Sequence, residues 1–182
     1  MRCRSPSQRN LIHRYQDYRT RRFLAHERTW SKSLPGWRTR SRRRTLVVAL
    51  ALTFTFMFAV SVLCAFGVSR APLLWLPACL AFFPLWTTLQ IVSGRRGDAP
   101  EAVLDEFEIA QRDSARSIGL TVTQNLMMIP VIYLILGAVL TEGADENMAY
   151  AGGLMTLVML LVGGCTPAMI LGWTQPDPLP ED

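Results

Sequence analysis

The sequence lacks ionisable side chains over four long stretches, and this absence defines its class. No Asp, Glu, Lys, Arg or His occurs in residues 45–68, 71–93, 118–140 and 148–173. Because an α-helix rises about 1.5 Å per residue, each stretch is long enough to cross a hydrocarbon core of roughly 30 Å. The sequence therefore predicts an all-α, polytopic membrane protein with four transmembrane helices.

The same absence excludes several kinds of function. Proton relays, voltage sensors and bis-histidine haem sites all need ionisable or imidazole groups inside the spans. Outside the spans, the sequence has no phosphate-binding Walker loop, no H-E-x-x-H helix and no nucleophile elbow. We therefore expect no catalytic residue, no cofactor and no enzymatic activity.

Cysteine and histidine are scarce, which argues against metal and disulfide chemistry. Cys3 lies in the N-terminal tail, whereas Cys64, Cys79 and Cys165 lie inside predicted spans. No C-x-x-C pair occurs and the two histidines are remote, so we expect neither a zinc site nor a disulfide framework. We interpret the three span cysteines as small, buried apolar side chains.

Lysine is nearly absent, and arginine is unevenly distributed. Residues 1–44 carry thirteen arginines and Lys32 against two acids, whereas the rest of the chain carries five arginines against twelve acids. The preference for arginine suggests a GC-rich, bacterial genome. No nucleic-acid-binding fold accompanies this basic tail, so we expect anionic lipid headgroups as its partner, with a protein as the alternative. The apolar side chains of the tail fit both an interfacial helix and a disordered segment.

Arginine near the span ends also predicts the orientation, because positively charged segments stay in the cytoplasm. The tail and the middle loop carry arginines close to the spans, whereas the first outer loop carries only Arg70 and residues 141–147 carry none. We therefore predict a multi-pass inner-membrane protein with both termini in the cytoplasm.

Loop lengths predict which spans are neighbours. Two residues separate the first two spans and seven separate the last two, so residues 45–93 and 118–173 should form two antiparallel hairpins. The linker between them, residues 94–117, predicts a cytoplasmic helix with Asp98 as its cap and Glu101 three residues later. We expect this helix to run directly into the third span. The remaining segments are the basic tail, 1–44, and an acidic C-terminal tail, 174–182.

Two amide side chains lie inside the third span. By helical rise, Gln124 and Asn125 are about 9–11 Å from its inner end. Because an unpaired amide in hydrocarbon is unfavourable, these side chains should face another helix or water. Two interpretations follow: hydrogen bonds between helices, worth about 0.6–2 kcal/mol each, or contact with a substrate or an ion.

Small residues recur at four-residue spacing in the fourth span, for example at Gly164, Ala168 and Gly172. Such steps let helix backbones approach closely. We therefore predict that Gly153, Gly164 and Ala168 lie at a helix–helix contact, within the protomer or between protomers. Pro167 removes a helix hydrogen bond and predicts a kink. The alternative interpretation of this region is a hinge or a pore-lining break.

A short segment before the third span resembles a group of known sequences. Residues 104–109, LDEFEI, are followed by residues 112–115, RDSA, and then directly by the span. The segment resembles small predicted bacterial membrane proteins of unknown function, in which a D-E-R-E-like segment and a basic, alanine-containing stretch precede a membrane hairpin. Phe107 stands in place of the arginine of that pattern. The resemblance implies four spans and no assigned activity.

These observations together predict a small, non-enzymatic integral membrane protein. We expect it to work as an accessory or regulatory subunit that packs its helices against membrane partners. The alternative is a small transporter or channel protein that forms its pathway as a homo-oligomer, because four spans leave little room for a pathway in one chain. Polar residues on one stripe of the third span, facing a symmetry axis, would favour this alternative.

Overall fold

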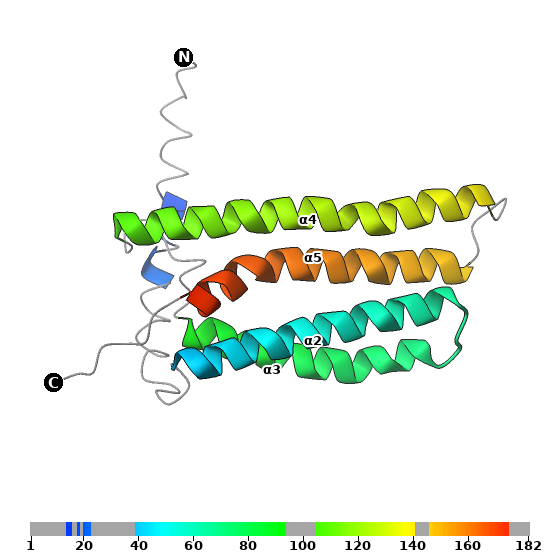
Figure 1. Ribbon diagram of the computed structural model, residues 1–182, viewed down its shortest axis with the longest axis horizontal. Helices are drawn as coiled ribbons and strands as arrows, with labels where there is room; N and C mark the ends of the chain where they lie inside the picture. Colours follow the sequence, from blue (N-terminus) through cyan, green and yellow to red (C-terminus); the bar gives the residue numbers. More distant parts are fainter. Residues whose placement is uncertain are drawn as a thin grey trace, which may run out of the picture.

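The computed structural model describes residues 39–93, 105–140 and 146–174, together with Arg14, Tyr15, Tyr18 and residues 20–22. The described residues form four long helices and no β-strand (Figure 1). All four helices are long and apolar enough to cross a membrane, which confirms the predicted all-α, four-span class. The helices are α2 (Arg40–Ala65), α3 (Trp75–Val92), α4 (Glu106–Leu140) and α5 (Glu146–Thr174).

A tight reversal joins α2 to α3. α2 ends at Ala65, before the predicted end of the first span at residue 68. Gly67 then takes a φ of 71°, a conformation that residues with a Cβ adopt only at a cost. The chain continues into a 3-10 helix, η2 (Ala71–Leu74), which has a proline in its first turn. Proline suits a helix start because its missing N–H would be unpaired there in any case. The second predicted span is therefore a 3-10 turn followed by an α-helix, and not one α-helix from residue 71.

The linker helix and the third span form one continuous helix over the described residues. α4 contains 35 residues from Glu106 to Leu140. Asp105 caps its start, because the Asp105 side chain accepts a hydrogen bond from the Glu106 N–H at 2.9 Å, and Glu108 accepts one from the Asp105 N–H at 3.5 Å. The predicted cap formed by Asp98 and Glu101 lies outside the described residues, as does most of the apolar pattern predicted for the N-terminal tail.

The core lies around α2, where three helices meet. Phe82 of α3 packs against Phe54 of α2 with ring centroids 5.8 Å apart, and it stacks on Trp86 at 6.5 Å. Leu50 and Leu89 are completely buried in the same cluster. The other buried members come from α2, α3 and α5, and α4 contributes none: Leu46, Val47, Met57, Ala78, Val158 and Cys165. α4 is thus the most peripheral of the four helices within the described part of the chain.

The order of packing is α3, α2, α5, α4. α2 lies between α3 and α5, and α4 packs mainly against α5 (Figure 1). Helices that follow one another in the chain, α2 with α3 and α4 with α5, are therefore in contact. The arrangement of the chain as two hairpins stays a prediction.

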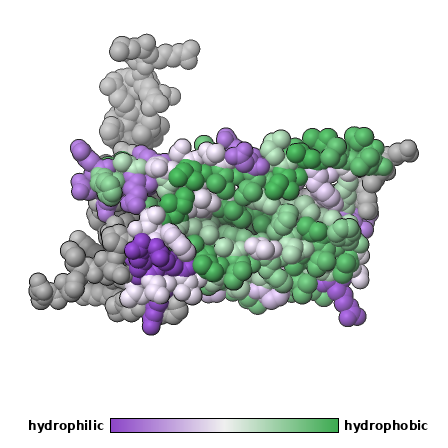
Figure 2. Space-filling model, in the orientation of Figure 1, coloured by the Kyte–Doolittle hydropathy of each residue, from purple (hydrophilic) through white to green (hydrophobic). Residues whose placement is uncertain are grey.

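The start of α2, the end of α3, the start of α4 and the end of α5 lie at one end of the bundle, on the left of Figure 1. Arg44 lies over the ring of Trp173 at 4.7 Å, and the Gln111 amide donates a hydrogen bond to the Thr174 hydroxyl at 3.2 Å. These contacts join α2, α4 and α5 at this level. We call this the arginine-rich end, because it contains Arg40, Arg42, Arg43, Arg44, Arg112 and Arg116. Figure 2 shows hydrophilic residues gathered there and a mostly hydrophobic surface over the rest of the bundle.

The last turns of α5 bend away from its axis towards α2 and α3 (Figure 1). Pro167 lies inside α5 at this level and removes a backbone hydrogen bond. Beyond it, Gly172 lies close to Leu89 and Val47, so that its backbone fits between α2 and α3. The kink predicted from Pro167 accordingly has a packing role in this chain, because it brings the end of α5 onto the α2–α3 pair.

Candidate functional site

The contact between α4 and α5 is an interlocking seam in which a glycine on one helix faces a larger side chain on the other. A Cβ added at Gly119 would lie 2.8 Å from the Pro167 ring, and one added at Gly163 would overlap the Thr123 side chain. At the other end of the seam, Leu134 fills the space beside Gly152, and Met148 fills the space beside Gly137. Each glycine permits a separation that any larger residue would prevent.

The seam runs antiparallel. Moving eleven residues along α4 from Thr123 to Leu134 moves the partner on α5 from Gly163 to Gly152, eleven residues in the opposite direction. Eleven residues make about three helical turns, so successive contacts stay on one face of each helix. The Thr123 hydroxyl also donates a 2.7 Å hydrogen bond to the Gly119 carbonyl, which holds its side chain towards its own helix.

The seam involves different glycines of α5 from the two named in the sequence analysis. Gly153 and Gly164 are exposed, and a Cβ at either position would meet no atom within 4 Å. Within this chain the packed glycines are instead their neighbours, Gly152 and Gly163, because adjacent helical residues point about 100° apart. Contact between protomers at Gly153 and Gly164, the other half of the prediction, stays a prediction. Ala168 is buried, and its place at a helix–helix contact stays a prediction.

The spacing of small residues in the fourth span could not show which two glycines pack against α4. Gly152–Gly163 and Gly153–Gly164 are both separated by eleven residues, so each pair would lie on one face. The distinguishing signal is on α4. Its two larger side chains, Thr123 and Leu134, are eleven residues apart, and they face Gly163 and Gly152 in antiparallel order. Gly119 and Gly137 lie on either side of them and give space to Pro167 and Met148 of α5.

The outer face of α4 carries an exposed row of polar side chains. On a helical wheel they fall within one arc of about 100°, and all are exposed to the surroundings of the bundle. Figure 2 shows a small hydrophilic patch along α4 with hydrophobic surface beside it. We call this row the α4 polar stripe; its members are Ser114, Ser117, Thr121, Gln124 and Asn125.

The α4 polar stripe retains unused hydrogen-bonding capacity. Most threonines of the spans donate to the carbonyl four residues earlier, which satisfies their hydroxyl without a neighbouring helix. The Thr121 hydroxyl donates to the Ser117 carbonyl at 3.0 Å, and the Asn125 side-chain amide donates one hydrogen to the Thr121 carbonyl at 2.9 Å. The Gln124 side chain forms no hydrogen bond with any described residue.

The seam also places Gln124 along the membrane normal. Its neighbour Thr123 faces Gly163, which is ten residues from Trp173 at the arginine-rich end. By helical rise, Gln124 therefore lies about 15 Å from that end, near the middle of a hydrocarbon core of roughly 30 Å. The distance predicted from the sequence is smaller, about 9–11 Å, because it is counted from the predicted start of the span at residue 118. In the structure, α4 is already level with Trp173 several residues before residue 118.

The stripe offers hydrogen bonding and no acid–base or metal chemistry. Among the residues that the structure describes, no group of three His, Cys, Asp or Glu side chains could hold a metal ion. Cys64 and Cys165 are buried without a disulfide. The ion pair between Arg112 and Asp113, at 2.9 Å, lies at the arginine-rich end and not within the spans.

Comparison with known proteins adds no family. No family model matches the chain, and neither a curated protein nor a solved structure matches it. The resemblance of residues 104–115 to small bacterial membrane proteins therefore stays a prediction. What can be said of function depends on the geometry of the bundle and its exposed surfaces.

Proposed function

We propose that this protein is a small, non-enzymatic accessory or regulatory membrane subunit that packs the outer face of α4 against a helix of another membrane protein. The observation that supports this proposal is the pair of exposed amides, Gln124 and Asn125, near the middle of a span. α4 is also the least buried of the four candidate spans. It therefore has the most surface left for a partner.

Hydrogen bonding gives this face its preference for a protein partner over lipid. Transfer of an amide from water to an alkane without a hydrogen bond costs about 4–8 kcal/mol. Lipid tails offer no donor or acceptor, whereas a second helix can supply both. Measured hydrogen bonds between membrane helices contribute about 0.6–2 kcal/mol each, so two amides give a modest but directional preference.

The test is affinity purification in mild detergent with and without the amides. In the double variant Gln124→Leu/Asn125→Leu, we expect the partner to be lost while the chain itself stays folded, because the new leucines are compatible with lipid. The matched control is Thr55→Val/Thr87→Val, which removes two exposed polar groups from α2 and α3 and should retain the partner. Retention of the partner by the leucine variant would contradict the proposal.

The second candidate is a transporter or channel formed by several copies of this chain. It is favoured by the alignment of all five polar side chains on one arc of α4, which is the arrangement needed around a symmetry axis. In this case the purified protein alone should be oligomeric, and Gln124→Leu/Asn125→Leu should reduce it to a monomer. Light scattering of the detergent complex distinguishes the two candidates, because an accessory subunit is oligomeric only together with its partner.

We further propose that both termini are cytoplasmic in a bacterial inner membrane, and that the basic tail adheres to anionic lipid. Four crossings return the chain to the side from which it started, and the arginine-rich end has the composition of a cytoplasmic boundary. A reporter that is active only outside the cytoplasm should be inactive after Asp182 and active within residues 141–147. Activity at Asp182 would contradict this orientation.

A further inference from the structure

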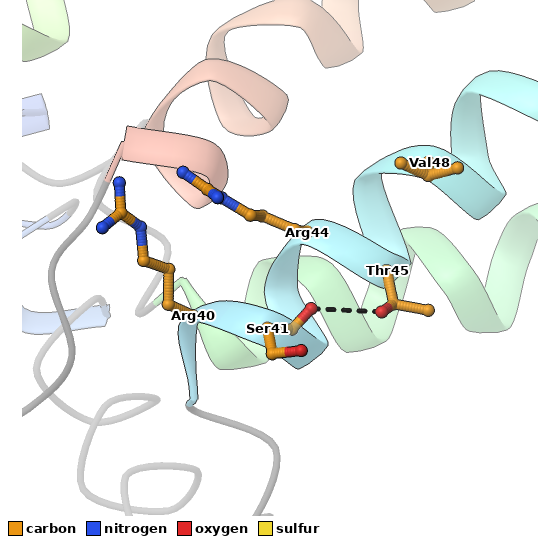
Figure 3. A pocket seen from close by; sticks show the side chains of 5 residues that line it. All are labelled: Arg40, Ser41, Arg44, Thr45 and Val48. Atoms are coloured by element: carbon orange, nitrogen blue, oxygen red, sulfur yellow. Dashed lines mark hydrogen bonds between the residues drawn. The ribbon is translucent and has the colours of Figure 1, made fainter.

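A pocket opens on the outer surface of α2 at the arginine-rich end. Its described walls all come from the first turns of α2 (Figure 3). Their spacing puts them on one face of the helix, with the two arginines towards the end of the bundle and Val48 towards the span. The lining residues are Arg40, Ser41, Arg44, Thr45 and Val48.

Arg44 is held in place by a neighbouring helix. Its guanidinium carbon lies 4.7 Å from the centre of the Trp173 ring on α5. Stacking of this kind uses the face of the planar guanidinium and leaves its N–H groups for an acceptor in the plane. The Arg44 Nε is buried and has no hydrogen-bond partner in the described part of the chain. An unsatisfied donor of this kind is unfavourable, and an acceptor bound close to the Arg44 guanidinium would relieve it.

The mouth of the pocket favours an anion. Arg40 lies one turn before Arg44, and in Figure 3 the two guanidinium groups extend to the same side of α2. The first turn of α2 contains no acidic residue, and its cap, Thr39, makes no side-chain hydrogen bond to the helix. The helix dipole therefore adds to the positive potential of the two arginines. A guanidinium group binds phosphate oxygens in a bidentate manner. Arg40 already interacts with another residue of the chain, and its five N–H donors allow it to contact a phosphate as well.

The floor of the pocket favours an apolar chain. Val48 is 48% exposed and Leu52, one turn further into the span, is 65% exposed. Phe56 continues the same exposed row and is 43% exposed. A ligand that satisfies both the arginines and this row has a phosphate at one end and a hydrocarbon chain at the other.

We infer that this pocket binds one anionic phospholipid, with its phosphate between Arg40 and Arg44 and an acyl chain along Val48 and Leu52. The site differs from the diffuse adhesion of the basic tail, because it has one occupant and a defined depth. It also joins α2 to α5 through the Arg44–Trp173 contact. The inference does not depend on the α4 polar stripe or its partner.

The experiment titrates phosphatidylglycerol onto the full chain in detergent and follows the first bound lipid by native mass spectrometry. The titration is done in about 1 M salt, where the Debye length is about 3 Å and diffuse binding by exposed arginines is screened. We expect Arg40→Gln/Arg44→Gln to weaken the first binding step by about tenfold. The matched control, Arg21→Gln/Arg22→Gln, removes two exposed arginines of the tail and should change it by less than about twofold. Equal losses in the two variants, or no loss in either, would overturn the inference.

Two further arms distinguish a phospholipid from free phosphate. Val48→Asn leaves both arginines in place and should weaken phosphatidylglycerol binding several-fold, because it removes the apolar floor. Excess glycerol 3-phosphate should not displace the bound lipid. Displacement by glycerol 3-phosphate together with no effect of Val48→Asn would assign the pocket to free phosphate and refute the lipid.

A conservative variant tests whether the loss of binding could come from misfolding. Arg44→Lys keeps the charge needed at the membrane boundary, but it loses the planar stacking on Trp173 and the bidentate contact with phosphate. We expect it to elute like the wild type and to lose at most about 1–2 kcal/mol of stability, while it binds phosphatidylglycerol several-fold more weakly. Wild-type affinity in Arg44→Lys would show that only the charge matters and would overturn the defined site.

Discussion

Gly163→Leu is expected to destabilise the bundle by about 3 kcal/mol or more, because the space for any side chain at this position is already filled. A Cβ at Gly163 would overlap the Thr123 side chain of α4. α4 packs mainly against α5, so the strain falls on the main contact that holds it. Thermal unfolding in mild detergent, followed by circular dichroism, measures the loss.

The adjacent glycine provides a matched control. Gly164→Leu is the same substitution one residue later, where a Cβ would meet no atom within 4 Å. We expect it to leave the melting temperature of the single chain nearly unchanged. Thr123→Ala in the background of Gly163→Ala should restore part of the lost stability, because it removes the side-chain atoms nearest the new methyl group. If Gly163→Leu and Gly164→Leu were equally stable, the α4–α5 register described above would be wrong.

Phe82→Ala is the second substitution with a large expected effect. Phe82 is 7% exposed; it joins α3 to α2 through its contact with Phe54, and it stacks on Trp86 of its own helix. Truncation of a buried phenylalanine costs about 3–5 kcal/mol in soluble proteins. Lipid tails are themselves apolar, so the part that comes from exposure to water is absent here and the loss of packing remains. We expect a decrease of about 2–3 kcal/mol in the free energy of unfolding.

Phe83→Ala tests whether this loss comes from packing. Phe83 is 63% exposed on the outer side of α3 and meets the Phe82 ring edge-on at 5.5 Å, so its removal should change stability by less than about 1 kcal/mol. Denaturation of both variants in mixed micelles with increasing sodium dodecyl sulphate gives the comparison. A greater loss in Phe83→Ala than in Phe82→Ala would contradict the core described for α2 and α3.

The span positions could be predicted because they depend on a property of the residues themselves. A run without charges long enough to cross a bilayer has few alternatives, and the continuity of the linker with the third span followed from helical pattern alone. The 3-10 turn at Ala71–Leu74 was missed because hydropathy does not register backbone geometry. The prolines near the start of that span were the available signal.

Helix registers could not be predicted in the same way, because they depend on two helices together. Gly163 and Gly164 are chemically identical neighbours, and only the shape of α4 decides which of them is packed. Likewise, the sequence predicted that Gln124 and Asn125 face another helix or water, but it could not tell whether that helix belongs to this chain. The answer came from Gly119, Thr123 and Leu134, which occupy the packed face of α4 and leave the amides outside.

The length of α4 has a mechanical consequence. Its 35 residues extend about 52 Å, roughly 20 Å more than the hydrocarbon thickness. No proline lies between Glu106 and Gln124, and a regular helix resists twisting about its axis. A displacement of α4 at Gln124 would therefore be carried along the helix axis to its start, where Gln111 contacts the end of α5. The exposed amides near the centre of the bilayer and the acidic first turn at Glu106 and Glu108 thus belong to one rigid element.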